Sequence, residues 1–109
     1  MSMVENLEAM LASGQDNALL RFTLGSALFK EGDALRAVEH LRTAVELDPG
    51  YSAAWKIYGK ALQLLDDPEA AREAFETGIA AATKKGDMQA AKEMSVFLKR
   101  VQKAINADT

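Results

Sequence analysis

The sequence predicts an all-α fold built from repeated helical hairpins, and three observations support this prediction. The chain of 109 residues has only two prolines and is rich in Ala, Leu, Glu and Lys, a composition that favours helix. No stretch alternates apolar and polar residues as a half-buried strand does. The chain also resembles itself at an offset of 34 residues, a period typical of stacked helical hairpins.

Residues 18–51 and 52–85 carry the same kinds of residue at corresponding positions. The pairs are Leu24 with Tyr58, Gly25 with Gly59, Leu28 with Leu62, Ala37 with Ala71, Leu41 with Phe75, and Ala44 with Gly78. A glycine inside a helix costs about 1 kcal/mol relative to alanine, so a glycine that recurs at a fixed interval needs a recurring benefit. We infer that neighbouring helices approach closely at Gly25 and Gly59. Ala37 and Ala71 would supply the small side chains on the opposing helices.

The second copy also has a characteristic order of residues. An aromatic residue, a large apolar residue with Gly, another large apolar residue, and then Ala and Phe are found at Trp55, Tyr58, Gly59, Leu62, Ala71 and Phe75. This order resembles the signature of the tetratricopeptide repeat family, whose fold is an α-α superhelix of stacked hairpins. The first copy departs from the signature at Arg21, where a large apolar or aromatic residue is usual. The second copy has Thr83 where the first has its closing Pro49.

Signals for helix starts and stops predict five to six helices. Gly14 closes the first helix, and Asp33 and Asp67 are expected N-caps. Ser52 follows a Pro-Gly turn and is expected to cap the helix after it. The predicted helices span residues 3–13, 17–31, 34–47, 52–65, 68–84 and 87–106.

The period divides this single domain, residues 1–109, into four parts. They are an N-terminal half-repeat helix at 3–17, repeat one at 18–51, repeat two at 52–85, and a final segment at 86–109. Core positions of a third repeat would be mostly polar, namely Gln89, Lys92, Glu93 and Val96. A different stripe has helical spacing: Ala91, Met94, Leu98, Val101 and Ile105. We interpret the last helix as a cap over the end of the repeats. The alternative is a coiled-coil or dimer seam, since the stripe also follows a heptad.

Composition excludes several classes of function. The chain has no cysteine and one histidine, His40, so neither a disulfide nor a zinc or iron site is expected. The glycines form no phosphate-binding run, and the serines have no evident partner base. The sequence therefore predicts no enzyme and no cofactor. We find no secretory signal and no apolar run long enough for a membrane span, so the expected location is cytoplasmic.

The net charge of −3 is unevenly distributed along the chain. Residues 84–103 contain six basic and two acidic side chains, a local charge of +4, so the rest carries −7. A basic helix can attract nucleic acid or anionic lipid. We interpret it instead as a solvated face with cations near a helix C-terminus, where they are favourable. Neither nucleic acid nor membrane is the expected partner.

The main functional prediction is a partner-binding groove. In the predicted helix 17–31, Leu20, Leu24 and Leu28 point inward, and a second apolar stripe remains. The family resemblance implies a hollow face lined by the first helix of each hairpin. The residues implied are Leu19, Phe22, Ser26, Phe29 and Lys30, followed by Ala53, Lys56, Lys60, Gln63 and Leu64. An aromatic wall beside a lysine wall suits an extended or helical peptide with apolar anchors and acidic groups.

Alternatives remain for this groove. The N-terminal helix, through Leu7, Met10 and Leu11, or the C-terminal helix could cover Phe22 and Phe29. The carboxylate clamp by which some family members hold chaperone tails requires Lys and Asn at set positions. Phe22, Ser26 and Ile57 stand at three of those positions, so the sequence argues against a chaperone-tail receptor. It predicts a protein- or peptide-binding adaptor, as a monomer or weak homodimer, with structural self-association through the C-terminal helix as the alternative function.

Overall fold

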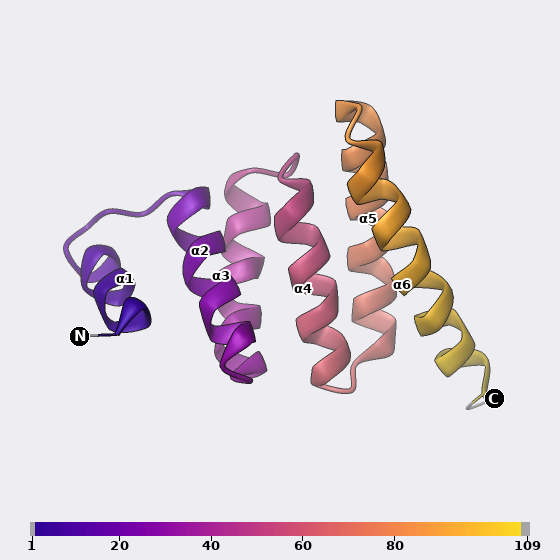
Figure 1. Cartoon of the computed structure of the whole chain (residues 1–109), viewed down its shortest axis with the longest axis horizontal. Helices are drawn as coiled ribbons and strands as arrows, with labels where there is room; N and C mark the ends of the chain where they lie inside the picture. Colours follow the sequence, from indigo (N-terminus) through magenta and orange to yellow (C-terminus); the bar gives the residue numbers. More distant parts are fainter. Residues whose placement is uncertain (1, 108–109) are drawn as a thin grey trace.

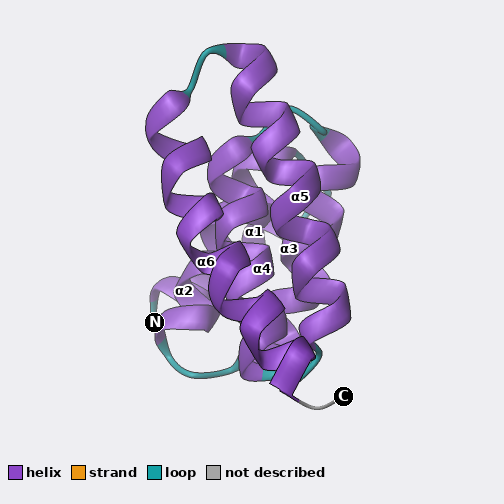
Figure 2. Cartoon of the chain, turned by 90° about the vertical axis from the view of Figure 1, so that its right-hand side faces the viewer, coloured by secondary structure: helices purple, strands orange, loops and turns teal. Residues whose placement is uncertain are grey.

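The computed structural model describes residues 2–107, which form six helices and contain no strand (Figures 1 and 2). The helices are α1 (Met3–Ala12), α2 (Ala18–Lys30), α3 (Ala34–Leu47), α4 (Ser52–Leu64), α5 (Pro68–Lys85) and α6 (Met88–Ala107). Every helix end lies within one residue of its predicted position. None of these helices is both long enough and apolar enough to cross a membrane.

The helices form two layers (Figure 1). One layer contains α2, α4 and α6, which lie side by side, and the other contains α3 and α5. Figure 2 shows the same layers nearly edge-on. From α2 onward, each helix packs against the next in the chain, and α4 also contacts α2 and α6 within its own layer. The all-α hairpin-repeat fold predicted from the sequence is therefore confirmed.

The recurring glycines mark the tightest contacts between the layers. A Cβ atom on Gly25 would lie 2.6 Å from Cγ of Leu41, and one on Gly59 would overlap the ring of Phe75. No side chain larger than hydrogen fits at either position without movement of its neighbour. The predicted benefit of these glycines, close approach between the helices of a hairpin, is confirmed.

The core runs through both repeats. The inward stripe predicted on α2, Leu20, Leu24 and Leu28, is buried. From the opposing helices, Leu41 and Phe75 are fully buried and belong, with Leu24 and Leu28, to one apolar cluster. Burying a large apolar side chain contributes about 1.5–3 kcal/mol, so these positions provide much of the stability of the stack.

One predicted cap is wrong. Asp33 and Asp67 do accept N-cap hydrogen bonds from Arg36 and Ala70, as expected. Ser52, however, is the first residue of α4, because Tyr51 occupies the N-cap position without a side-chain hydrogen bond. The buried hydroxyl of Ser52 instead donates to a carboxylate oxygen of Asp87 at 2.8 Å. Ser52 therefore ties α4 to the start of α6.

Helix α6 covers the end of the stack through the predicted stripe. Ala91, Met94 and Val101 are buried, and Leu98 and Ile105 pack half-buried against the same cluster. The sulfur of Met94 lies where Gly78 leaves space: a Cβ there would come within 2.5 Å of it. The apolar stripe is thus used inside the chain, along α5 and α4.

Candidate partner-binding face

The predicted groove residues lie on α2 and α4, in the layer that also contains α6. We call the surface of these three helices the α2–α4–α6 face. Its predicted residues differ in exposure. Leu19, Lys30 and Leu64 are exposed, whereas Phe22, Ser26, Phe29, Ala53, Lys56, Lys60 and Gln63 are half-buried.

Phe22 is covered by a residue that neither alternative considered. Its ring lies 4.9 Å from that of Tyr51, at an interplanar angle of 39°. Tyr51 comes from the turn before α4, and both rings pack on a small cluster that includes Ala44 and Val45. Phe22, one of the rings of the predicted aromatic wall, is therefore partly buried at the junction of α2, α3 and α4.

Helix α1 lies against a different part of α2. Its Leu7 and Met10 line a cavity of about 200 Å³ together with Leu19 and Leu20. The side chain of Glu8 also forms an ion pair with Arg36 of α3. These contacts place α1 at the first end of the stack, beside the start of α2.

Polar contacts join α4 and α6 along the face. About one helical turn after Ser52, which bonds Asp87, Nζ of Lys56 lies 3.5 Å from a carboxylate oxygen of Glu93. The Ser52 hydroxyl and the main-chain N–H of Ala90 lower the pKa of Asp87. The charge of Lys56 is therefore balanced within the chain, so only part of the predicted lysine wall is available to bind acidic groups of a partner.

Lys60 has aromatic rather than acidic neighbours. Its Nζ lies 5.6 Å from the ring centroid of Phe29 on α2 and 5.2 Å from that of Phe97 on α6. The guanidinium carbon of Arg100 lies 5.7 Å from the same Phe97 ring. Phe97 itself stacks at 5.7 Å on the buried ring of Phe75. Phe29, Lys60 and Phe97 thus form a row across all three helices.

Sequence reasoning missed Phe97 and Arg100. The stripe that predicts the cap uses Met94 and Leu98 and passes over Phe97, although Phe97 lies three residues after Met94 and on an adjoining face. That spacing was the available signal. The role of Arg100 depends on the position of the Phe97 ring, which the sequence does not give.

Two further predicted residues have particular surroundings. The hydroxyl of Ser26 is buried and has no hydrogen-bond partner among the described residues. Gln63 lines a cavity of about 130 Å³ together with Arg100 and Asp66. This cavity extends the face toward the start of α5.

Arg21 replaces the aromatic residue of the repeat signature with a polar network. Its guanidinium donates two hydrogen bonds to Asp16, at 2.8 and 2.9 Å, and lies 3.1 Å from Nδ1 of His40. Burial, and next the charge of Arg21, lower the pKa of His40. Within residues 2–107 no group of three acidic, histidine or cysteine side chains could hold a metal ion.

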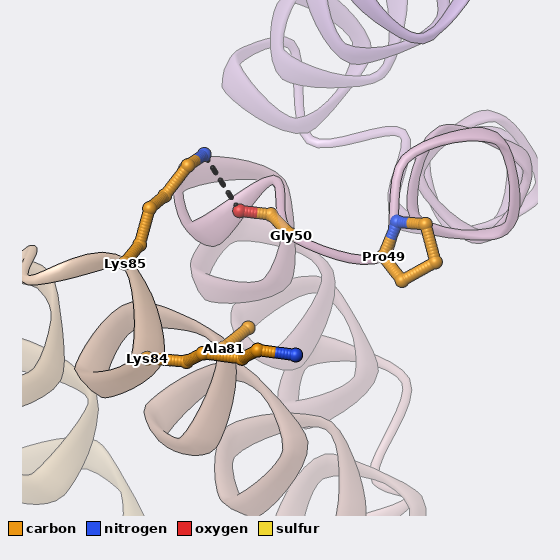
Figure 3. Close-up of a pocket in the computed structure, with 5 residues that line it drawn as sticks. All are labelled: Pro49, Gly50, Ala81, Lys84 and Lys85. Carbon is orange, nitrogen blue, oxygen red and sulfur yellow. Dashed lines mark hydrogen bonds between the residues drawn. The ribbon is translucent and has the colours of Figure 1, made fainter.

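A separate cavity of about 410 Å³ lies between the turn after α3 and the end of α5 (Figure 3). Pro49, Gly50 and Ala81 line it with Lys84 and Lys85. Nζ of Lys85 donates to the carbonyl oxygen of Gly50 at 2.8 Å. The lining contains no carboxylate, histidine or hydroxyl side chain, and it includes none of the predicted groove residues.

Comparisons with known proteins agree with this architecture. The family model described as tetratricopeptide repeat matches residues 28–94. A TPR repeat-containing protein of Pseudomonas aeruginosa is 56% identical over 102 residues, which cover 94% of this chain and 97% of that protein. A solution structure of a Bordetella parapertussis protein is 49% identical, covers 95% of this chain and 90% of that one, and has a TM-score of 0.82. The Sgt2 TPR domain of Aspergillus fumigatus is 27% identical, with a TM-score of 0.78 over 94% of this chain and 66% of that one.

Proposed function

Because the chain belongs to the tetratricopeptide repeat family, we propose that it is an adaptor that binds a segment of a protein partner on its α2–α4–α6 face. The fold is typically a protein–protein interaction module, and members of the family are generally scaffolds without catalytic activity. The proposed partner is therefore a protein or peptide rather than a small substrate.

The row formed by Phe29, Lys60 and Phe97 is the observation that carries the proposal. It spans three helices and combines half-buried rings with a cation. Aromatic residues at the centre and polar groups around them are the usual composition of a binding interface. Leu19 and Leu64, 64% and 60% exposed, add apolar surface on α2 and α4. Leu64 lies about one helical turn after Lys60, whereas Leu19 lies at the opposite end of α2 from Phe29. The two leucines therefore provide exposed apolar surface at both ends of the face.

The test uses two variants that change similarly exposed leucines on different layers. Leu19→Asp combined with Leu64→Asp alters the α2–α4–α6 face. Leu35→Asp is the control, because Leu35 is 65% exposed but lies on α3, in the other layer. Wild-type and variant proteins are used to capture partners from a native lysate, and each captured protein is then purified for direct binding measurements.

We expect wild type and Leu35→Asp to bind the same partner with similar affinity. The double variant should lose at least tenfold in affinity, about 1.4 kcal/mol, because it places charges where apolar contacts form. Circular dichroism and urea unfolding check that all three proteins are folded. Equal binding by all of them would refute the proposed face.

The α6 stripe gives no support to self-association as a second function. Met94 and Val101, which would form the centre of a dimer seam, are buried against the rest of the same chain. We therefore propose a single function for this chain.

A further inference from the structure

Two cations converge on the ring of Phe97. Nζ of Lys60 and the guanidinium carbon of Arg100 lie 5.2 and 5.7 Å from its centroid. Neither side chain forms an ion pair with any carboxylate of residues 2–107. A cation that has no counter-ion within its own chain is available to an anionic group of a partner.

The rest of the α4–α6 seam is balanced internally. Asp87 accepts the hydrogen bond of Ser52, and Glu93 pairs with Lys56. Lys60 and Arg100 are therefore the two cations of this face that lie against an aromatic ring and have no ion pair with a described carboxylate. At Lys60, α2 also contributes the ring of Phe29.

We propose that Lys60 and Arg100, with the rings of Phe29 and Phe97, recognise an acidic side chain that lies beside an apolar side chain in an internal segment of the partner. This inference rests on the proposed function and specifies the chemistry of its ligand. A cation–π contact near a protein surface is a weak interaction. Charge-assisted hydrogen bonds to a carboxylate are stronger, so an acidic side chain of the partner is expected to bind these cations while its apolar neighbour packs on the rings.

The position of the cations favours an internal segment over a chain terminus. Arg100 lies in the interior of α6, with more than one helical turn on either side. Lys60 lies on α4, the helix between α2 and α6 in Figure 1, and its Nζ lies near a ring from each of those two helices. A bound chain can continue past the cations in both directions.

The test is a selection from a random 12-residue peptide library displayed at the N-terminus of a phage coat protein, so that no peptide has a free C-terminus. Wild type is compared with Lys60→Gln/Arg100→Gln. The matched control is Lys99→Gln/Lys103→Gln, which removes two exposed cations from α6 that lie on neither ring. Selected peptides are then synthesised in acidic form, and with each Asp or Glu changed to the amide, for affinity measurements at two salt concentrations.

We expect wild type and the control to select peptides with Asp or Glu next to an aliphatic or aromatic residue. The Lys60/Arg100 variant should lose this enrichment and bind the acidic peptides at least tenfold more weakly, while its affinity for the amide peptides stays unchanged. Higher salt should weaken binding of the acidic peptides to wild type more than to that variant.

The outcomes separate this inference from the proposed function. Two outcomes would overturn the inference alone, both with peptides whose binding depends on Leu19 and Leu64. In the first, the selected peptides show no preference for Asp or Glu. In the second, Lys60→Gln/Arg100→Gln selects the same acidic peptides as wild type. Binding only by synthetic peptides with a free C-terminal carboxylate would also overturn it. If wild type selects no peptides, or only peptides indifferent to Leu19 and Leu64, the proposed function fails as well.

Discussion

The indole Nε1 of Trp55 donates a hydrogen bond to the main-chain carbonyl oxygen of Pro49 at 2.8 Å. Trp55 is the aromatic residue of the second repeat signature, and Pro49 closes the first repeat. Trp55 also lies against α5, because a Cβ atom added to Gly78 would lie 2.6 Å from the Cβ of Trp55. One side chain therefore joins the two copies.

Removing this side chain should destabilise the whole stack. Trp55→Ala is expected to cost about 3–5 kcal/mol, because a large half-buried side chain is lost between helices. Trp55→Phe keeps most of the packing but loses the hydrogen bond to Pro49, and we expect it to lower the free energy of unfolding by about 1 kcal/mol. Urea unfolding followed by circular dichroism measures both values. Equal losses for the two variants would show that the ring contributes no packing energy beyond the hydrogen bond.

The glycine at position 59 should tolerate no side chain. Gly59→Ala places a methyl group into the ring of Phe75. We expect a net loss of about 1–3 kcal/mol from overpacking, despite the better helix propensity of alanine. Gly50→Ala is the control, because its Cβ would meet only Asp48, at an ordinary 3.6 Å. The free energies of unfolding, from chemical denaturation, should differ clearly between the two variants, and a stabilised Gly59→Ala protein would contradict the close approach.

The cap helix should contribute to global stability through one face only. Met94→Ala is expected to cost about 2–5 kcal/mol, because Met94 is fully buried against Gly78. Val96→Ala, on the same helix but 48% exposed, should change stability by about 0.5 kcal/mol or less. Thermal unfolding of the two variants under identical conditions tests this difference. Similar losses would mean that the face of α6 carrying Val96 is also buried in solution.

Acid should destabilise the protein in part through His40. Its pKa in the folded chain is lowered from 6.5 by burial and by Arg21. The unfolded chain therefore binds a proton first as the pH falls, so the free energy of unfolding declines below pH 6.5 and stops declining below the folded pKa. Above pH 6.5 the contribution is fully present. His40→Gln should lack this decline.

The measurement is urea unfolding at several pH values between about 5 and 8, with wild type and His40→Gln in parallel. The salt link to Arg21 also lowers the pKa of Asp16, but that carboxylate loses its contribution only as the pH falls below 3.8. The two effects therefore occupy separate pH ranges. Identical slopes for wild type and variant above pH 5 would remove His40 as a cause.

Local signals in the sequence predict the fold well because the repeat makes each of them appear twice. Gly25 with Gly59, and Leu41 with Phe75, fix the register of the hairpins without any tertiary information. The same logic fails at Ser52, whose partner, Asp87, lies 35 residues away on another helix. A capping residue and a side chain that bonds a neighbouring helix look alike in sequence.

The candidate site is less predictable for the same reason. The family resemblance points to α2 and α4, but the charge balance of the face depends on α6, which has lost the repeat signature. Glu93 forms an ion pair with Lys56, and the ring of Phe97 forms a cation–π contact with Lys60. Tyr51, which covers Phe22, comes from a turn that no periodic pattern describes. These pairings depend on helix-to-helix distances and side-chain directions that only the folded chain provides.

Among residues 2–107, the backbone of α1 approaches only that of α2, and Glu8 of α1 forms an ion pair with Arg36 of α3. Because Val4 is the one buried residue of α1, we expect α1 to detach while the remaining five helices stay folded, at a free energy below that of global unfolding. Backbone amides of residues 3–12 would then exchange with solvent through this partial opening. Helix α1 lies over the surface around Leu20, and this surface becomes exposed to solvent when α1 detaches.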